Sequence, residues 1–263
     1  MLFDAHVHVF PDKLEGKVLP KLSAISQSPY YLDETVSSAT TLHYSMGGTH
    51  MLCLNIATNP KQQSSVNDFA NSINNGNIIS FGSVHPKSDD AIKELYRIKD
   101  MGLKGIKLHP DYQDFIADDK NMHQIYKVCE ELNLMITFHT GKDPYSPTVI
   151  HCTPKSIQNI ATSFPNLTII AAHMGGMGMC DDSMKYLKNL NNVYLDTAYS
   201  SQFLTSHKLE EMIKFHGVDR ILFATDSPWS KIDIEKKLLD NTNLKSDELD
   251  KIYYKNSFEL FKL

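Results

Sequence analysis

Short apolar runs alternate with segments of helical spacing along almost the whole chain. Eight runs have the length and β-branched or aromatic content of buried strands, at residues 2–9, 49–57, 78–84, 105–110, 134–138, 167–172, 193–195 and 221–225. Segments of helical spacing lie between them, at residues 33–46, 60–74, 88–101, 119–132, 154–164, 183–190 and 207–215, and two or three more helices are expected from residue 232 onward. Residues 11–29 carry Pro, Gly and Lys, and we expect them to form a long loop over the mouth of a site.

This alternation predicts the fold class. Strands that alternate with helices pair in parallel, and eight such units form a closed barrel. We therefore expect an α/β protein with a (β/α)8 TIM-barrel fold, in which residues 1–263 form a single domain. The competing fold, a doubly wound open sheet, needs a Gly-rich phosphate loop after the first strand, where this chain has His6, Val7 and His8.

Composition excludes several classes of partner. A formal net charge of −5 and a total of two arginines offer no surface for nucleic acid. No apolar run approaches the ~20 residues that a membrane span needs. The four cysteines show no C-x-x-C spacing, which is typical of a reduced compartment, and a strand that begins at residue 2 leaves no room for a cleaved signal peptide. We expect a cytoplasmic protein that acts on a small molecule; whether it forms a homo-oligomer stays open.

Candidate metal ligands gather at the strand ends. His6 and His8 are spaced i, i+2 on the first strand, so both side chains point the same way, and Asp4 is expected on that same face as a structural carboxylate. Six of the 12 histidines fall at or near a strand end: His6, His8, His85, His109, His139 and His173. The eighth strand ends in Asp226. In a barrel this rim holds the active site, and imidazole and carboxylate groups suit Zn²⁺, Mn²⁺ or Fe²⁺.

Five segments at these strand ends carry a family resemblance: residues 4–8, 105–110, 138–141, 172–176 and 222–228. In this order and spacing they resemble the amidohydrolase superfamily, specifically its branch of predicted metal-dependent hydrolases of the TIM-barrel fold, which includes aminocarboxymuconate-semialdehyde decarboxylase. The resemblance implies a divalent metal, with zinc as the expected ion, held by His6, His8, His139 and Asp226.

Two further residues leave the number of ions open. The resemblance implies that His173 is either a catalytic acid/base or a ligand of a second ion. Lys107 is either a carboxylated lysine that bridges two ions or an ammonium group that binds a substrate carboxylate. We expect one well-occupied site, with a second, weaker one that involves Lys107 and His173.

Other residues near the rim are candidates for substrate contact. We assign substrate binding to His109, Tyr112, Lys142 and Trp229, with specificity expected from Lys142 and the loop at residues 143–152. Asp196, at the end of the seventh strand, either orients a ligand or caps the next helix, and we expect the cap.

Hydrolysis is the reaction that we expect first. A bound metal lowers the pKa of water, and Asp226 can accept the water proton and later deliver it to the leaving group. These groups fit the hydrolysis of an amide, a lactone or another ester. The alternative is non-oxidative decarboxylation within the same superfamily, and a second alternative is a non-catalytic metal-binding barrel.

Overall fold

The computed structural model describes residues 1–33 and 35–263. Its strands are β1 (Phe3–Val7), β2 (His50–Leu54), β3 (Ile78–Phe81), β4 (Gly105–Leu108), β5 (Met135–Phe138), β6 (Ile169–Ala171), β7 (Val193–Asp196) and β8 (Ile221–Leu222). The α-helices are α1 (Leu19–Ser26), α2 (Val36–Ser45), α3 (Gln63–Ile73), α4 (Ala91–Asp100), α5 (Pro110–Gln113), α6 (His123–Leu132), α7 (Pro154–Ser163), α8 (Cys180–Tyr186), α9 (Ser206–His216), α10 (Ile232–Asp240), α11 (Ser246–Asp250) and α12 (Asn256–Phe261). Short 3₁₀ turns lie at Asp12–Leu14, Lys120–Met122, Ser200–Gln202 and Val218–Arg220, and a π-helical turn lies at Lys251–Lys255.

The eight predicted strands and the helices between them are present, with bounds that shift by a few residues. Residue 34, inside the predicted helix at 33–46, lies outside the described residues. The observed helix is α2, which begins at Val36. The Thr35 hydroxyl caps its N-terminus by accepting a hydrogen bond from the N–H of Ser38. Among the described residues, no helix has the length and hydropathy needed to cross a bilayer.

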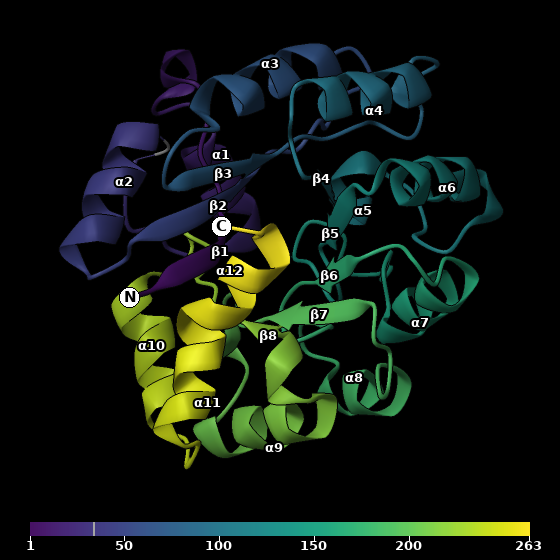
Figure 1. Ribbon diagram of the computed structural model, residues 1–263. Helices are drawn as coiled ribbons and strands as arrows, with labels where there is room; N and C mark the ends of the chain where they lie inside the picture. The colour runs from purple at the N-terminus through teal and green to yellow at the C-terminus, as the bar shows by residue number, and fades with distance from the viewer. Residues whose placement is uncertain (34) are drawn as a thin grey trace.

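The strands close into one ring. All pairings within the groups β1-β2-β3 and β4-β5-β6-β7-β8 are parallel. Between β3 and β4, the N–H of Gly82 donates to the carbonyl of Gly105 at 3.0 Å. Between β8 and β1, the N–H of Asp226 donates to the carbonyl of His6 at 2.9 Å. The predicted TIM barrel is therefore confirmed, and Figure 1 shows the helices arranged around the strands.

The barrel interior below the carboxyl ends of the strands is filled with apolar side chains. Residues from strands that are not neighbours can meet only inside the barrel, and one buried cluster joins such residues. Its members are Phe3, Ala5, Leu52, Leu54, Ile79, Phe81, Ile170, Ala198, Leu222, Ala224 and Phe261. The Phe261 ring of α12 stacks on Phe3 with centroids 5.4 Å apart. This packing excludes water beneath the strand ends.

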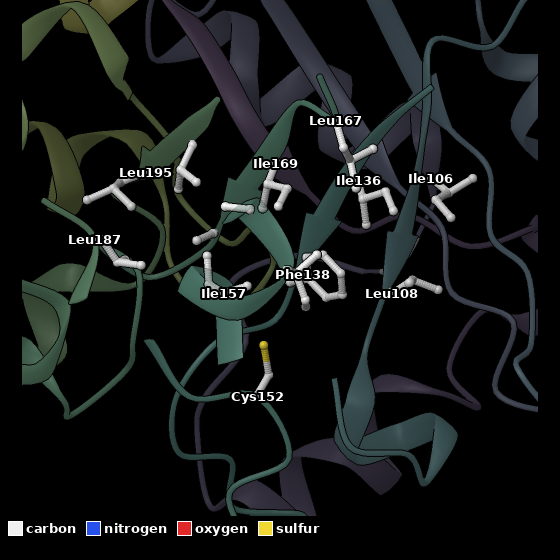
Figure 2. Packing of buried hydrophobic residues seen from close by; sticks show 14 of the residues in the cluster. Ile106, Leu108, Ile136, Phe138, Cys152, Ile157, Leu167, Ile169, Leu187 and Leu195 are labelled. Atoms are coloured by element: carbon white, nitrogen blue, oxygen red, sulfur yellow. The ribbon is translucent and has the colours of Figure 1, made fainter. Parts of the chain in front are cut away.

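A larger apolar cluster lies between the strands and the outer helices. Figure 2 shows Ile136 and Phe138 of β5 beside Ile157 of α7, with residues of β4, β6 and β7 around them. On β4, Ile106 and Leu108 belong to this outer cluster. Because side chains alternate along a strand, Lys107 between them points into the barrel. By the same alternation, His109, two positions after Lys107, also points toward the interior of the barrel.

A β-bulge changes the alternation of β1. Asp4 pairs with Met51 and Val7 with Cys53, so three steps along β1 match two steps along β2. The bulge separates Asp4 from the face that carries His6, so the expectation that they share a face is wrong. Asp4 instead accepts hydrogen bonds from the N–H and hydroxyl of Thr225, at 2.9 and 2.6 Å, and remains a buried structural carboxylate.

The loop predicted at residues 11–29 is partly helical. α1 lies within it, with Pro20 in its first turn and Gln27 in the left-handed conformation at its C-cap. The Tyr199 hydroxyl donates to the Ser28 hydroxyl at 3.1 Å and ties the end of this segment to the barrel. The predicted position over the site is correct, because α1 contributes Leu22 to the cavity wall.

Candidate active site

The carboxyl ends of the strands surround one cavity, with an empty volume of about 830 Å³ that includes its open mouth. Nine of the ten predicted site residues line it: His6, His8, Lys107, His109, Tyr112, His139, His173, Asp226 and Trp229. The tenth, Lys142, is exposed and does not line it. His85 also lies outside the lining; its Nδ1 accepts the N–H of Lys87 at 3.2 Å.

The i, i+2 spacing places His6 and His8 side by side, and the bulge in β1 turns both toward the cavity. Their Nε2 atoms are 3.2 Å apart, and each is 3.3 Å from Oδ1 of Asp226. Asp226 follows β8 with a left-handed φ of 66°. Three potential ligand atoms from opposite ends of the sequence therefore meet at one point.

The proton positions on these two rings follow from their partners. Nδ1 of His6 lies 2.9 Å from Oδ2 of Asp196, and Nδ1 of His8 lies 2.9 Å from the carbonyl of Leu54. The Leu54 carbonyl accepts, and so does Asp196 in its ionised form, so each proton then lies on Nδ1 and each Nε2 presents a lone pair. Burial, together with the nearby Lys107, holds the pKa of His6 well below its usual value, which keeps this ring neutral.

His173 orients His139 in the same way. Its Nδ1 lies 3.0 Å from the carbonyl of Ala198, so Nδ1 donates and Nε2 accepts. That Nε2 lies 3.0 Å from Nδ1 of His139, which must donate. Nε2 of His139 is then left with a lone pair, and it is a buried nitrogen without a hydrogen-bond partner. Burial lowers the pKa of His173 to about 4 and holds that of His139 well below its usual value.

Asp196 is the anchor of this arrangement. Besides His6, it holds the backbone N–H groups of His173 and Ala198, which donate to Oδ1 at 2.9 and 3.1 Å. Burial raises its pKa to about 7. The expectation that Asp196 caps the next helix is wrong, since the Thr205 hydroxyl caps α9.

Lys107 is fully buried beside His6, with Nζ 3.3 Å from Nε2. Burial lowers its pKa to about 8, although Asp196 and Asp226 oppose this shift. A lowered pKa increases the share of neutral amine, which is the form that reacts with CO2, whereas the cationic form attracts a carboxylate. The position of Lys107 is compatible with both of its predicted roles.

Aromatic rings form one wall of the cavity. His139 stacks on His109 with centroids 4.3 Å apart, and His109 stacks on Tyr112 at 3.7 Å. The edge of Tyr145 meets Tyr112 at 5.1 Å. Apolar side chains also line the cavity, among them Leu22. The cavity thus suits a flat, largely apolar ligand with few polar groups.

Asp143 is a lining residue that the sequence did not single out, although it begins the loop expected to set specificity. Its Oδ1 accepts the N–H of Tyr145 at 2.6 Å, in a turn that directs the side chain inward. Oδ2 lies 3.4 Å from Nε2 of His139 and 3.6 Å from Nε2 of His109. Burial raises the pKa of Asp143 to about 7. Lys142 is exposed and does not line the cavity, so the predicted substrate contact from this loop falls to Asp143 instead of Lys142.

The donor set fits a divalent cation. Ligands that share one ion at about 2.1 Å stand roughly 3.0–3.4 Å from one another, and the contacts among His6, His8 and Asp226 are 3.2–3.3 Å. Lys107 approaches Nε2 of His6 alone, at 3.3 Å, so a cation among the three atoms would also offset the repulsion between the lone pair of His8 and the Asp226 carboxylate. The orphaned Nε2 of His139 offers a third nitrogen, which would be the fourth ligand.

A second group, His109, His139 and Asp143, fits a cation less well. The first two rings stack with their planes within 12°, so their lone pairs run side by side instead of converging. Nδ1 of His109 also accepts the N–H of Tyr112 at 3.4 Å, which places the ring proton on Nε2.

Comparisons with known proteins identify relatives. A family profile described as Amidohydrolase matches residues 3–263. A gamma-resorcylate decarboxylase of Polaromonas sp. (strain JS666 / ATCC BAA-500) is 29% identical over 135 residues, which is 44% of this chain. The match covers 40% of that relative's length.

Solved structures share the fold over the full chain. The 5-carboxyvanillate decarboxylase of Sphingomonas paucimobilis has a TM-score of 0.74 at 15% identity, with 100% of this chain and 99% of that chain covered. A dihydroxybenzoic acid decarboxylase of Polaromonas sp. JS666, solved with manganese and the inhibitor 2-nitroresorcinol, has a TM-score of 0.72 at 20% identity and covers 100% and 97%.

These comparisons correct the predicted reaction. The relative and both neighbours are decarboxylases, so the prediction of a hydrolase is wrong and the decarboxylase alternative is favoured. The choice of zinc among divalent ions stays a prediction. The family itself rests on the match along nearly the whole sequence: this chain belongs to the amidohydrolase family.

Proposed function

We propose that this protein is a metal-dependent, non-oxidative decarboxylase of an aromatic acid with a hydroxyl group beside its carboxylate. The observation that carries the proposal is the convergence of two imidazole lone pairs and the Asp226 carboxylate at one side of an aromatic-walled cavity. The sequence relative, a gamma-resorcylate decarboxylase, supports this reaction class.

One divalent ion would be held by His6, His8 and Asp226, with His139 as the fourth ligand. Manganese is the ion to test first because a structural neighbour contains it, and zinc is the second. When bound, the ion supplies a Lewis acid that holds oxygen atoms of the substrate and stabilises their negative charge.

Asp226 is the residue that we assign to proton transfer. Its carboxylate would take a proton from the substrate hydroxyl group and deliver it to the ring carbon that bears the carboxylate. The carbon–carbon bond then breaks, its electron pair restores the aromatic ring, and CO2 leaves. The product phenolate regains a proton from solvent, which balances the reaction.

The surrounding residues hold the substrate and the ligands in place. Lys107 supplies a positive charge that attracts the substrate carboxylate. His173 positions His139, because both of its ring nitrogens are engaged. Tyr112 and Trp229 line the space for the aromatic ring, and α1 covers it.

The test is CO2 release from a panel of hydroxyaryl carboxylates, including 2,6-dihydroxybenzoate, by protein loaded with Mn²⁺ or Zn²⁺. Asp226→Asn should lower turnover about 10²–10⁴-fold, because it removes a positioned proton carrier. Metal content is measured alongside, since Asp226 is also a proposed ligand. A metal-loaded wild type that releases no CO2 from any member of the panel would overturn the assignment and favour a non-catalytic barrel.

A further inference from the structure

The loop at residues 141–152 is a closed and anchored segment at the cavity mouth. The two ends of the loop are joined by a hydrogen bond from the N–H of Gly141 to the carbonyl of Cys152, at 2.8 Å. Asp111 of α5, fully buried, anchors the loop from below. Its Oδ1 accepts from Nδ1 of His151 at 3.0 Å and from the Ser146 hydroxyl.

These anchors resemble a hydrolytic triad in composition but not in geometry. Ser146 and Asp111 both approach the same nitrogen, Nδ1 of His151, so the ring cannot pass a proton from one to the other. Their effect is positional: they fix the path of the loop that carries Asp143. A carboxylate held in a fixed loop can discriminate among ligands, because it does not move aside for a poor fit.

Asp143 is placed to accept a hydrogen bond from a ligand. It is 8% exposed and lines the cavity, and Oδ1 is already engaged by the Tyr145 N–H. Oδ2 faces the histidine side of the cavity, 3.4 Å from His139 and 3.6 Å from His109. Neither contact is within ordinary hydrogen-bond length, so Oδ2 retains capacity for a closer donor.

The cavity also lacks a partner for a second carboxylate. Lys107 is the one lysine among the described lining residues, and no arginine is among them. Both arginines of the chain are engaged elsewhere: Arg97 pairs with Glu94 on α4, and Arg220 donates to the carbonyl of His216. Because Lys107 and the proposed ion would both engage the first carboxylate, a second carboxylate would find no cationic side chain among the described lining residues.

We propose that Asp143 is a specificity residue, whose Oδ2 accepts a hydrogen bond from a hydroxyl or amino group of a substrate that carries a single carboxylate. The inference rests on the proposed aromatic acid substrate. It adds that the ring carries a donor directed at the loop, and that dicarboxylates are poor substrates.

Binding of probes that cannot lose CO2 tests this independently of turnover. Trp229 is the single tryptophan of the chain and lines the cavity, so quenching of its fluorescence reports occupancy. The probes, used with the Mn²⁺-loaded protein, are 2-nitroresorcinol, its mono-methyl ether, which lacks one donor, and 4-hydroxy-3-methoxy-5-nitrobenzoate, which lacks the same donor and adds a carboxylate. Wild type should prefer 2-nitroresorcinol over the ether by about 10–100-fold, because a hydrogen bond to a charged group is lost. It should bind the ether more tightly than the nitrobenzoate, because these two have the same functional groups apart from the carboxylate.

Asp143→Ala should reduce the ratio between the first two probes to about 1–3, and Asp143→Asn, which keeps an acceptor oxygen, should give an intermediate ratio. Asp114→Asn is the matched control: Asp114 is exposed and paired with Lys87, so the wild-type ratio should persist. An unchanged ratio in Asp143→Ala with metal still bound would overturn the proposal. Loss of Mn²⁺ from both Asp143 variants would also overturn it, by making Asp143 a ligand. Absence of CO2 release with the ratio intact would instead count against the proposed reaction alone.

Discussion

Asp196→Asn separates the orientation of His6 from the fold of the barrel. The Asp196 carboxylate holds two backbone N–H groups through Oδ1 and the His6 ring through Oδ2. An asparagine at this position is nearly the same size. Its amide oxygen should keep the two N–H donors, because the reverse orientation would leave both without an acceptor. The amide NH2 then faces Nδ1 of His6.

Two donors cannot bond to each other, so the His6 proton must move to Nε2. That move removes the lone pair that faces His8 and Asp226. Loss of the partner that orients a metal-binding histidine costs about 10–100-fold in affinity, which is roughly 1.4–2.7 kcal/mol. We therefore expect Mn²⁺ and Zn²⁺ to bind Asp196→Asn more weakly by this factor, with little change in melting temperature.

Competition with a chromophoric chelator measures the affinity, and circular dichroism measures the melting temperature. Asp4→Asn is the matched control, because Asp4 is equally buried and bonds to Thr225 and to the backbone N–H of His6, but contacts no histidine ring of the site. It should alter stability more than metal affinity. Metal affinity of Asp196→Asn within about threefold of wild type would refute the assignment of the His6 proton to Nδ1.

Two further predictions concern regions around the site. Burial raises the pKa of Glu235 from 4.5 to about 7, so the folded chain binds more protons than the unfolded chain between these values, and stability falls as pH rises through this range. Glu235→Gln, which can still bond to Ser201 and Ser230, should remove this loss of roughly 2–4 kcal/mol; equal slopes of melting temperature against pH in both proteins would contradict it. Tyr199→Phe deletes the hydrogen bond to Ser28, which follows α1, and should raise KM about 2–10-fold with little change in kcat, because α1 covers the cavity. An unchanged KM would show that this hydrogen bond does not hold α1 over the cavity.

The sequence was sufficient for the fold and for most of the rim, for a physical reason. Parallel strands buried on both faces appear as short apolar runs, and their carboxyl ends must lie at one edge of a barrel. Residues at those ends therefore share a location even when they are far apart in the chain. This argument placed Lys107, His139 and Asp226 in one cavity, and it required no knowledge of side-chain contacts.

Long-range partners and loops were beyond this argument. Asp196 and His6 are 190 residues apart, and both capping and orientation are ordinary roles for an aspartate after a strand. Asp143 and Lys142 are neighbours in a loop, where no period predicts which side chain points inward. α1 is an eight-residue helix with weak amphipathic pattern in a segment that also contains Pro and Gly, so its helical state depends on packing over the cavity.

The bulge in β1 is the feature that alternation could not provide. Strict period-two alternation would direct Phe3 and His6 to opposite faces, so one strand could not both fill the barrel and supply the site. All five residues of β1 are buried, so the apolar pattern carries no information about which face each occupies. The extra residue between Asp4 and Val7 reverses the alternation, which lets Phe3 pack in the interior below while His6 and His8 face the cavity above. A strand of this length can serve both functions only by interrupting its own period, and Asp4, displaced to the outer face, then bonds to Thr225 and fixes β1 against β8 beside Asp226.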